Sequence, residues 1–252
     1  MPGKVGLIRR AGALLIFVAL WQLLALCFPG ALAVASPLDS LRALWDLGGT
    51  AAFWKRILLS STRIGLGFLL SASAASAAAV LSFHIPAVEV FFAPFITLMK
   101  SVPLAVIVIL LLILFSSTGI ALAVVSLVTF PIFYTALLAG ARAADAKLLE
   151  MARVFCWSEA RKWRWIRLSA ARGHLRSALR VAAGMAWKAG VSAEVLGTPQ
   201  GSIGEALYGA KVYLDTEELF AWAAVILFLG WLMERLSLTL LDGLYCLREI
   251  DV

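Results

Sequence analysis

Six long apolar stretches run along the chain, and most of its charges lie between them. We expect membrane-spanning helices at about residues 11–29, 62–82, 91–115, 119–139, 177–197 and 218–240. Each stretch is long enough, because about 20 helical residues cross the roughly 30 Å of hydrocarbon in a bilayer. The pattern therefore predicts an all-α integral membrane protein with six transmembrane helices.

Two regions of these spans carry further information. Residues 101–141 contain no charged side chain, which is enough for more than one crossing, and the cluster at 116–119 (Ser-Ser-Thr-Gly) marks the expected break. The middle of the second span, residues 71–79, consists entirely of Ala and Ser. Small residues let helix backbones approach closely, so we expect the second span to pack against other helices.

The composition supports the same class of protein. The 252 residues are 62% hydrophobic and 15% charged, whereas soluble proteins are roughly 45–50% apolar and about 25% charged. This excludes a soluble globular domain and a disordered chain. The cysteines, Cys27, Cys156 and Cys246, are odd in number, which argues against a disulfide scaffold.

The basic residues are concentrated in one segment. Residues 142–180 hold ten of the 22 Lys and Arg residues against three acidic ones, an excess equal to the formal net charge of +7. In so apolar a chain, a basic loop indicates the cytoplasmic side of a membrane rather than binding of nucleic acid. With this loop and both termini inside, 15 basic residues are cytoplasmic and 5 are outside. We expect the first span to remain as an anchor, because its apolar run of about 18 residues exceeds the 7–15 of a signal peptide.

No catalytic or cofactor motif occurs in the sequence. It lacks the phosphate-binding pattern GxxxxGK[ST], the zinc motif HExxH, a CxxC pair and the GxSxG nucleophile elbow. His84 and His174 fall on different predicted loops without a metal-ligating neighbour. We therefore expect no enzyme activity, no cofactor and no metal, so an ion gradient or a partner protein would have to supply the energy for any transport.

The basic loop also has an apolar face. Residues 146–167 contain no Gly or Pro and predict one helix. Along it, Leu148, Met151, Ala152 and Phe155 recur at helical spacing. Such a helix can lie on lipid headgroups or dock into a groove of a partner protein, and the residues alone leave both open.

Residues 145–155 (DAKLLEMARVF), followed by Ile166-Arg167-Leu168, resemble the EAA loop of ATP-binding-cassette (ABC) importer permeases of type I. Five further segments resemble motifs of that family in the same order: STRIGLGF (61–68), KSVPLA (100–105), FPI (130–132), AEVLG (193–197) and GSIG (201–204). Together the motifs cover roughly residues 60–240. The branch that the chain resembles most is that of the nitrate, sulfonate and taurine-like permeases.

This resemblance implies a fold and a set of partners. The fold would be a MetI-like transmembrane domain at 60–241, after a first helix and outer loop at 1–59 and before a cytoplasmic tail at 242–252, with the coupling loop at about 140–176. The partners would be two ATPase subunits, a second permease copy in a homodimer, an external substrate-binding protein, and the lipid bilayer of a bacterial or archaeal cell membrane. Nitrate, sulfonates, taurine and thiamine precursors are all possible solutes, and no residue chooses among them.

The resemblance also assigns the loop to coupling with the ATPase, with apolar and acidic side chains as direct contacts and arginines as a polar rim. The candidate coupling residues are Glu150, Met151, Ala152, Arg153, Phe155, Cys156, Arg161 and Leu168. Two positions depart from the family, because Cys156 replaces its usual Gly, and Ser169 replaces the Pro that usually follows Leu168. Since Cys adopts a left-handed backbone only at a cost, we expect another type of turn at Cys156.

Three charged side chains lie within predicted spans: Lys188 and Glu194 in the fifth, and Lys100 in the third. A lysine at the centre of a span costs roughly 2.5–3.5 kcal/mol. Lys188 and Glu194 lie about 120° apart around their helix, so we expect their partners on other helices or on a second copy. These residues could line a translocation path or form a structural network, and we favour the network.

Two other classes of membrane protein are alternatives to an ABC importer permease. A secondary transporter driven by an ion gradient would often contain inverted repeats, and the first three spans do not visibly resemble the last three. A membrane scaffold without transport activity has no positive sign in the sequence.

Overall fold

The computed structural model describes residues 4–27 and 35–250, and over these residues it contains helices and no β-strand. The all-α prediction is confirmed. The helices are α1 (Lys4–Cys27), α2 (Pro37–Gly48), α3 (Ala51–His84), α4 (Pro86–Ser101), α5 (Leu104–Leu114), α6 (Ile120–Arg142), α7 (Ala146–Val154), α8 (Glu159–Lys162), α9 (Leu168–Gly197), α10 (Ile203–Val212) and α11 (Thr216–Ile250). A 3-10 turn at Ser117–Gly119 precedes α6, and a π-helical turn at Trp163–Arg167 joins α8 to α9.

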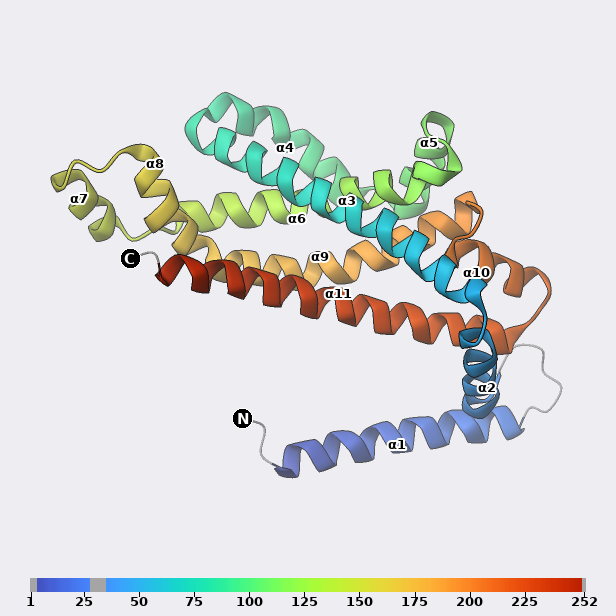
Figure 1. Ribbon diagram of the computed structural model, residues 1–252. Coiled ribbons are helices and arrows are strands. Elements are labelled where there is room, and N and C mark those ends of the chain that lie inside the picture. The colour runs from blue at the N-terminus through green and yellow to red at the C-terminus, as the bar shows by residue number, and fades with distance from the viewer. Residues whose placement is uncertain (1–3, 28–34, 251–252) are drawn as a thin grey trace.

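The centre of the molecule is α6, which packs against both α3 and α9 (Figure 1). The packing is close because small residues lie at the contacts. A Cβ atom on Gly67 of α3 would lie 2.7 Å from the carbonyl oxygen of Leu122, and one on Gly140 of α6 would lie 2.6 Å from the Cα of Ala171. Ala75, in the small-residue stretch of the second predicted span, is fully buried. The expectation that this span packs closely on other helices is confirmed.

Fewer than six of the described helices are long and apolar enough to cross a membrane on their own. Three meet that condition, at Ala51–His84, Ser117–Arg142 and Thr216–Cys246. The first predicted span lies in α1, of which Leu15–Cys27 is an apolar stretch, and the fifth lies in α9, whose first half is basic. Six spans therefore stay a prediction.

The third predicted span is not one helix. α4 and α5 meet at a bend of 113°, and as a pair they could form a fourth span. Pro103 explains the break, because it has no backbone N–H and disfavours helical geometry at Val102, whose backbone is extended. The expectation of one continuous helix over 91–115 is wrong.

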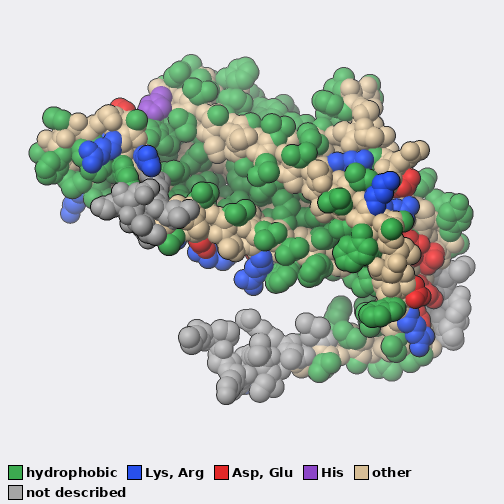
Figure 2. Space-filling view, viewed as in Figure 1, with side chains coloured by type: hydrophobic (Ala, Val, Ile, Leu, Met, Phe, Trp, Pro, Cys, Tyr) green, Lys and Arg blue, Asp and Glu red, His purple; other side chains and the backbone are tan. Residues whose placement is uncertain are grey.

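The two ends of the bundle carry different elements. The end of α11, α7 and α8 lie at one end, and α2, α5 and α10 lie at the other; α1 extends from the α2 end towards the first (Figure 1). Basic and hydrophobic side chains gather over α7 and α8 (Figure 2). The last described helix therefore finishes on the side of the basic loop, and the orientation of both termini in the membrane stays a prediction.

Candidate coupling loop and translocation face

The predicted coupling loop contains two short helices rather than one. α7 begins after Asp145, whose Oδ1 accepts a hydrogen bond from the backbone N–H of Lys147 at 2.8 Å. α8 begins after Ser158, whose Oγ accepts one from the backbone N–H of Arg161 at 3.3 Å. The expectation of a single helix is wrong, because Ser158 starts a second helix as an N-cap residue.

Cys156 forms the turn between α7 and α8. Its backbone is left-handed, with a φ of 51°. The backbone N–H of Trp157 donates to the carbonyl of Ala152 at 2.8 Å, and that of Cys156 donates to Arg153 at 3.0 Å. Glycine usually adopts this helix-ending conformation. The expectation of another type of turn is therefore wrong, and Cys156 keeps the glycine geometry at a cost of about 1–2 kcal/mol.

Most of the candidate coupling residues reach the surface. Those exposed are Glu150, Met151, Arg153, Phe155, Cys156 and Arg161. Ala152 is fully buried, and Leu168, at the start of α9, is half-buried. Val154 and Phe155 are 79% and 69% exposed, so the end of α7 is an apolar tip that projects from the loop.

Charge within α8 is partly balanced by neighbouring side chains. Lys162 donates a hydrogen bond to Glu159 at 2.7 Å, and this bond lowers the pKa of the Glu159 carboxyl. The guanidinium of Arg161 lies 4.4 Å from the centre of the Trp157 ring. Both contacts hold basic side chains against the loop and leave the tip of α7 uncovered.

Contacts with the end of α3 hold the second half of the loop. The indole N–H of Trp163 donates a hydrogen bond to Nε2 of His84 at 2.7 Å, and the guanidinium of Arg167 lies 4.2 Å from the centre of the Phe83 ring. These contacts join the loop to the helix of the second predicted span. Sequence reasoning missed them because Trp163 and His84 are 79 positions apart and neither belongs to a recognisable motif.

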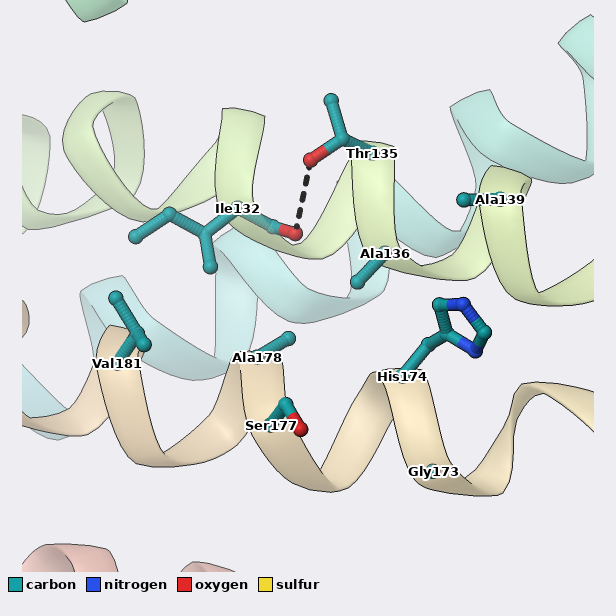
Figure 3. Close-up of a pocket in the computed structure, with 9 residues that line it drawn as sticks. All are labelled: Ile132, Thr135, Ala136, Ala139, Gly173, His174, Ser177, Ala178 and Val181. Atoms are coloured by element: carbon teal, nitrogen blue, oxygen red, sulfur yellow. Dashed lines mark hydrogen bonds between the residues drawn. The ribbon is translucent and has the colours of Figure 1, made fainter.

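A groove of about 680 Å³ runs between α6 and α9. His174, predicted on a loop, belongs to α9, and its ring reaches towards Ala136 and Ala139 of α6 (Figure 3). Residues three or four positions apart share one face of a helix. The same face of α9 presents four exposed side chains: Val181, which lines the groove, and Met185, Lys188 and Ser192, which lie beyond it. We call these four residues, with the groove, the α9 face.

Lys188 lies on the α9 face without a hydrogen bond or ion pair to any described residue. Lys100 is exposed as well, and it lies just before the bend between α4 and α5. Within the described part of the chain, no three His, Cys, Asp or Glu side chains gather as a metal site would require.

Glu194 lies away from the α9 face and is fully buried. Its Oε2 accepts hydrogen bonds from Oγ of Ser60 on α3 at 2.7 Å and from the backbone N–H of Gly204 on α10 at 3.3 Å. Nη1 of Arg63 lies 3.7 Å from Oε1. The Ser60 hydroxyl in turn accepts a bond from the N–H of Ile203 at 2.9 Å. The carboxylate therefore joins α3, α9 and α10, and the structure does not bring it together with Lys188.

Comparison with known proteins identifies relatives of this architecture. The family described as binding-protein-dependent transport system inner membrane component matches residues 67–242. An aliphatic sulfonates transport permease of Bacillus subtilis is 25% identical over 237 residues, which cover 92% of this chain and 86% of that protein. The crystal structure of an amino acid ABC transporter with histidines matches with a TM-score of 0.57 at 16% identity, over 80% of this chain and 94% of the other, which shows a shared fold.

Proposed function

We propose that this chain, which belongs to the family of binding-protein-dependent transport system inner membrane components, forms the membrane path of an importer for small organic anions of the sulfonate class. As a member of that family, the chain is a permease subunit of an ABC importer. The class of solute and the residues that meet it are the new part of the proposal.

The observation that carries the proposal is the position of Lys188. Its ammonium group lies on an exposed side of α9, in the middle of the predicted fifth span, and no described residue neutralises it. A cation surrounded by low-dielectric material attracts anions strongly, because Coulomb interactions grow as the dielectric constant falls. A sulfonate is a permanent anion, and its charge is opposite in sign to that of the Lys188 ammonium group. The relative named for aliphatic sulfonates supports the same class.

Two copies of the chain would enclose the path. In a two-fold dimer each copy presents the same surface to the other, so two α9 faces would meet and place one Lys188 on each side of the solute. An external binding protein would deliver the solute at the end where α2 and α10 lie. Two ATPase subunits would bind at the opposite end, below α7 and α8.

The tip of α7 would make the contact with each ATPase subunit. Met151 and Phe155 are exposed apolar side chains on a short helix, as helix-in-groove recognition requires. Glu150 and Arg153 flank them and would orient the contact. Because Ala152 is buried, it would support this surface from behind.

Uptake by proteoliposomes tests the role of Lys188. The permease, reconstituted with its ATPase and binding protein, should take up radiolabelled ethanesulfonate only when ATP is supplied. Lys188→Gln should slow uptake about tenfold or more, since a hydrogen bond to a charged group contributes about 1.5–3 kcal/mol. Lys55→Gln removes an exposed lysine at the start of α3 and serves as the matched control.

The outcomes of this experiment distinguish a role of Lys188 in the path from a general effect of charge, and an ABC importer from a secondary transporter. Normal uptake by Lys188→Gln would refute its place in the path, and loss of uptake in both lysine variants would indicate a general effect of charge. Uptake driven by an ion gradient without ATP would identify a secondary transporter instead.

A further inference from the structure

The short helix α2 lies where two predicted spans meet. It follows α1 and precedes α3, and it runs across the direction of both (Figure 1). Its 12 residues extend about 18 Å, which is too short to cross roughly 30 Å of hydrocarbon. The side chain of Ser36 caps its first turn, accepting a hydrogen bond from the N–H of Asp39 at 3.1 Å. α2 is therefore a separate helix lying across one end of the bundle.

Two of the three sides of α2 are readily explained, because one packs on the protein and the other is charged. The first side packs on the protein through Ser40, which is buried, and through Leu44 and Leu47, which contact the hydrophobic core. The second side carries Arg42 and Asp46, both exposed. Hydrophobic and charged side chains both gather around this end of the molecule (Figure 2). The charged side is suited to water.

The third side of α2 is apolar and uncovered. At about 100° per residue, Leu38, Leu41 and Trp45 fall on one side of the helix, centred roughly 125° from the packed side and roughly 90° from the charged side. They are 56%, 63% and 84% exposed. Full burial of one such side chain contributes about 1.5–3 kcal/mol. Leaving all three exposed to water would therefore forgo this stabilisation three times.

This apolar side continues onto a helix that meets the membrane. The indole N–H of Trp54, in the first turn of α3, donates a hydrogen bond to the carbonyl of Gly48 at the end of α2, at 2.9 Å. Trp54 and Leu58, one turn further along α3, are 61% and 66% exposed. The apolar surface thus extends from α2 onto α3, which is long and apolar enough to cross a bilayer. Tryptophan is enriched at the boundary between lipid and water.

We propose that α2 is an interfacial helix that binds the lipid of the outer leaflet. Leu38, Leu41 and Trp45 insert between headgroups and acyl chains, while Arg42 and Asp46 face water. Helices with separate apolar and charged sides lie in the plane of the membrane in this way. A protein arriving from outside would meet the charged side first, which leaves the apolar side to lipid. Since α2 packs on α11, this attachment fixes the depth of the outer end of the bundle.

Spin labels in proteoliposomes test the proposal. Single cysteines replace Leu41 or Asp46 in the full chain freed of its three natural cysteines, and each variant is labelled in vesicles of phosphatidylethanolamine and phosphatidylglycerol. Oxygen concentrates in lipid, whereas a nickel chelate stays in water. The ratio of oxygen to nickel accessibility should be several-fold higher for Leu41→Cys than for Asp46→Cys. Leu38→Cys provides a second position on the apolar side with the same expectation.

Two results would overturn the proposal. Equal nickel accessibility at Leu41 and Asp46 would place the apolar side in water. Exclusion of both reagents from Leu41, with magnetic coupling between labels on two copies, would identify a second copy of the chain as the partner of this side.

Discussion

Replacing Glu194 with alanine should destabilise the protein strongly. The buried carboxylate accepts hydrogen bonds from Ser60 at 2.7 Å and from the N–H of Gly204 at 3.3 Å, and it lies 3.7 Å from the guanidinium of Arg63. Alanine would remove the acceptor from both donors and leave the mostly buried charge of Arg63 without its counterion. Removing one partner of a buried ion pair costs about 3–5 kcal/mol, and we expect a loss of unfolding free energy of that size.

Thermal unfolding of the purified permease in detergent measures this loss, and limited proteolysis of the connection at 198–202 reports whether α10 has come loose. Glu194→Gln keeps one acceptor oxygen and should lose less stability than Glu194→Ala. Lys188→Ala is the control, because it removes an exposed charge from another side of the same helix and should change stability by about 0.5 kcal/mol or less. A Glu194→Ala variant as stable as the wild type would show that Glu194 does not hold α3, α9 and α10 together. Glu194 would then again be a candidate for the translocation path.

The hydrophobic pattern predicted helices more reliably than their interruptions. The stretch 91–115 is almost uniformly apolar, and apolarity alone does not distinguish one helix from two. Pro103 was visible in the sequence, but the 113° bend at that point depends on how α5 packs against α6 and α9. The helix α2 was not predicted, although Ser36 and Pro37 form a typical helix start. Apolar and polar residues are mixed along α2, so it contains no long apolar run.

Long-range partners were beyond the reach of the sequence. Helical spacing placed Lys188 and Glu194 on different sides of α9, and the structure keeps them apart. Nothing local indicated Ser60 as a partner of Glu194, since 134 positions separate them. At Cys156 the expectation drawn from the residue type was wrong, because the turn has the left-handed backbone that cysteine usually avoids. Two backbone hydrogen bonds close the end of α7 there, and together they outweigh a left-handed penalty of about 1–2 kcal/mol.

Two further predictions concern the coupling loop. Cys156→Gly should stabilise the turn between α7 and α8 by up to about 1 kcal/mol, because glycine adopts the φ of 51° without strain but loses more chain entropy; slower proteolysis at the turn would show this, and faster cleavage would contradict it. Phe155→Ala should weaken binding of the ATPase about tenfold or more, because burial of a Phe side chain contributes about 1.5–3 kcal/mol. Arg161→Ala should weaken it less and in a salt-dependent way, since exposed charges are screened. Pull-down of the ATPase across a salt series separates these effects. If Phe155→Ala binds and transports normally, the tip of α7 does not contact the ATPase, and binding of the loop to lipid headgroups becomes the better interpretation.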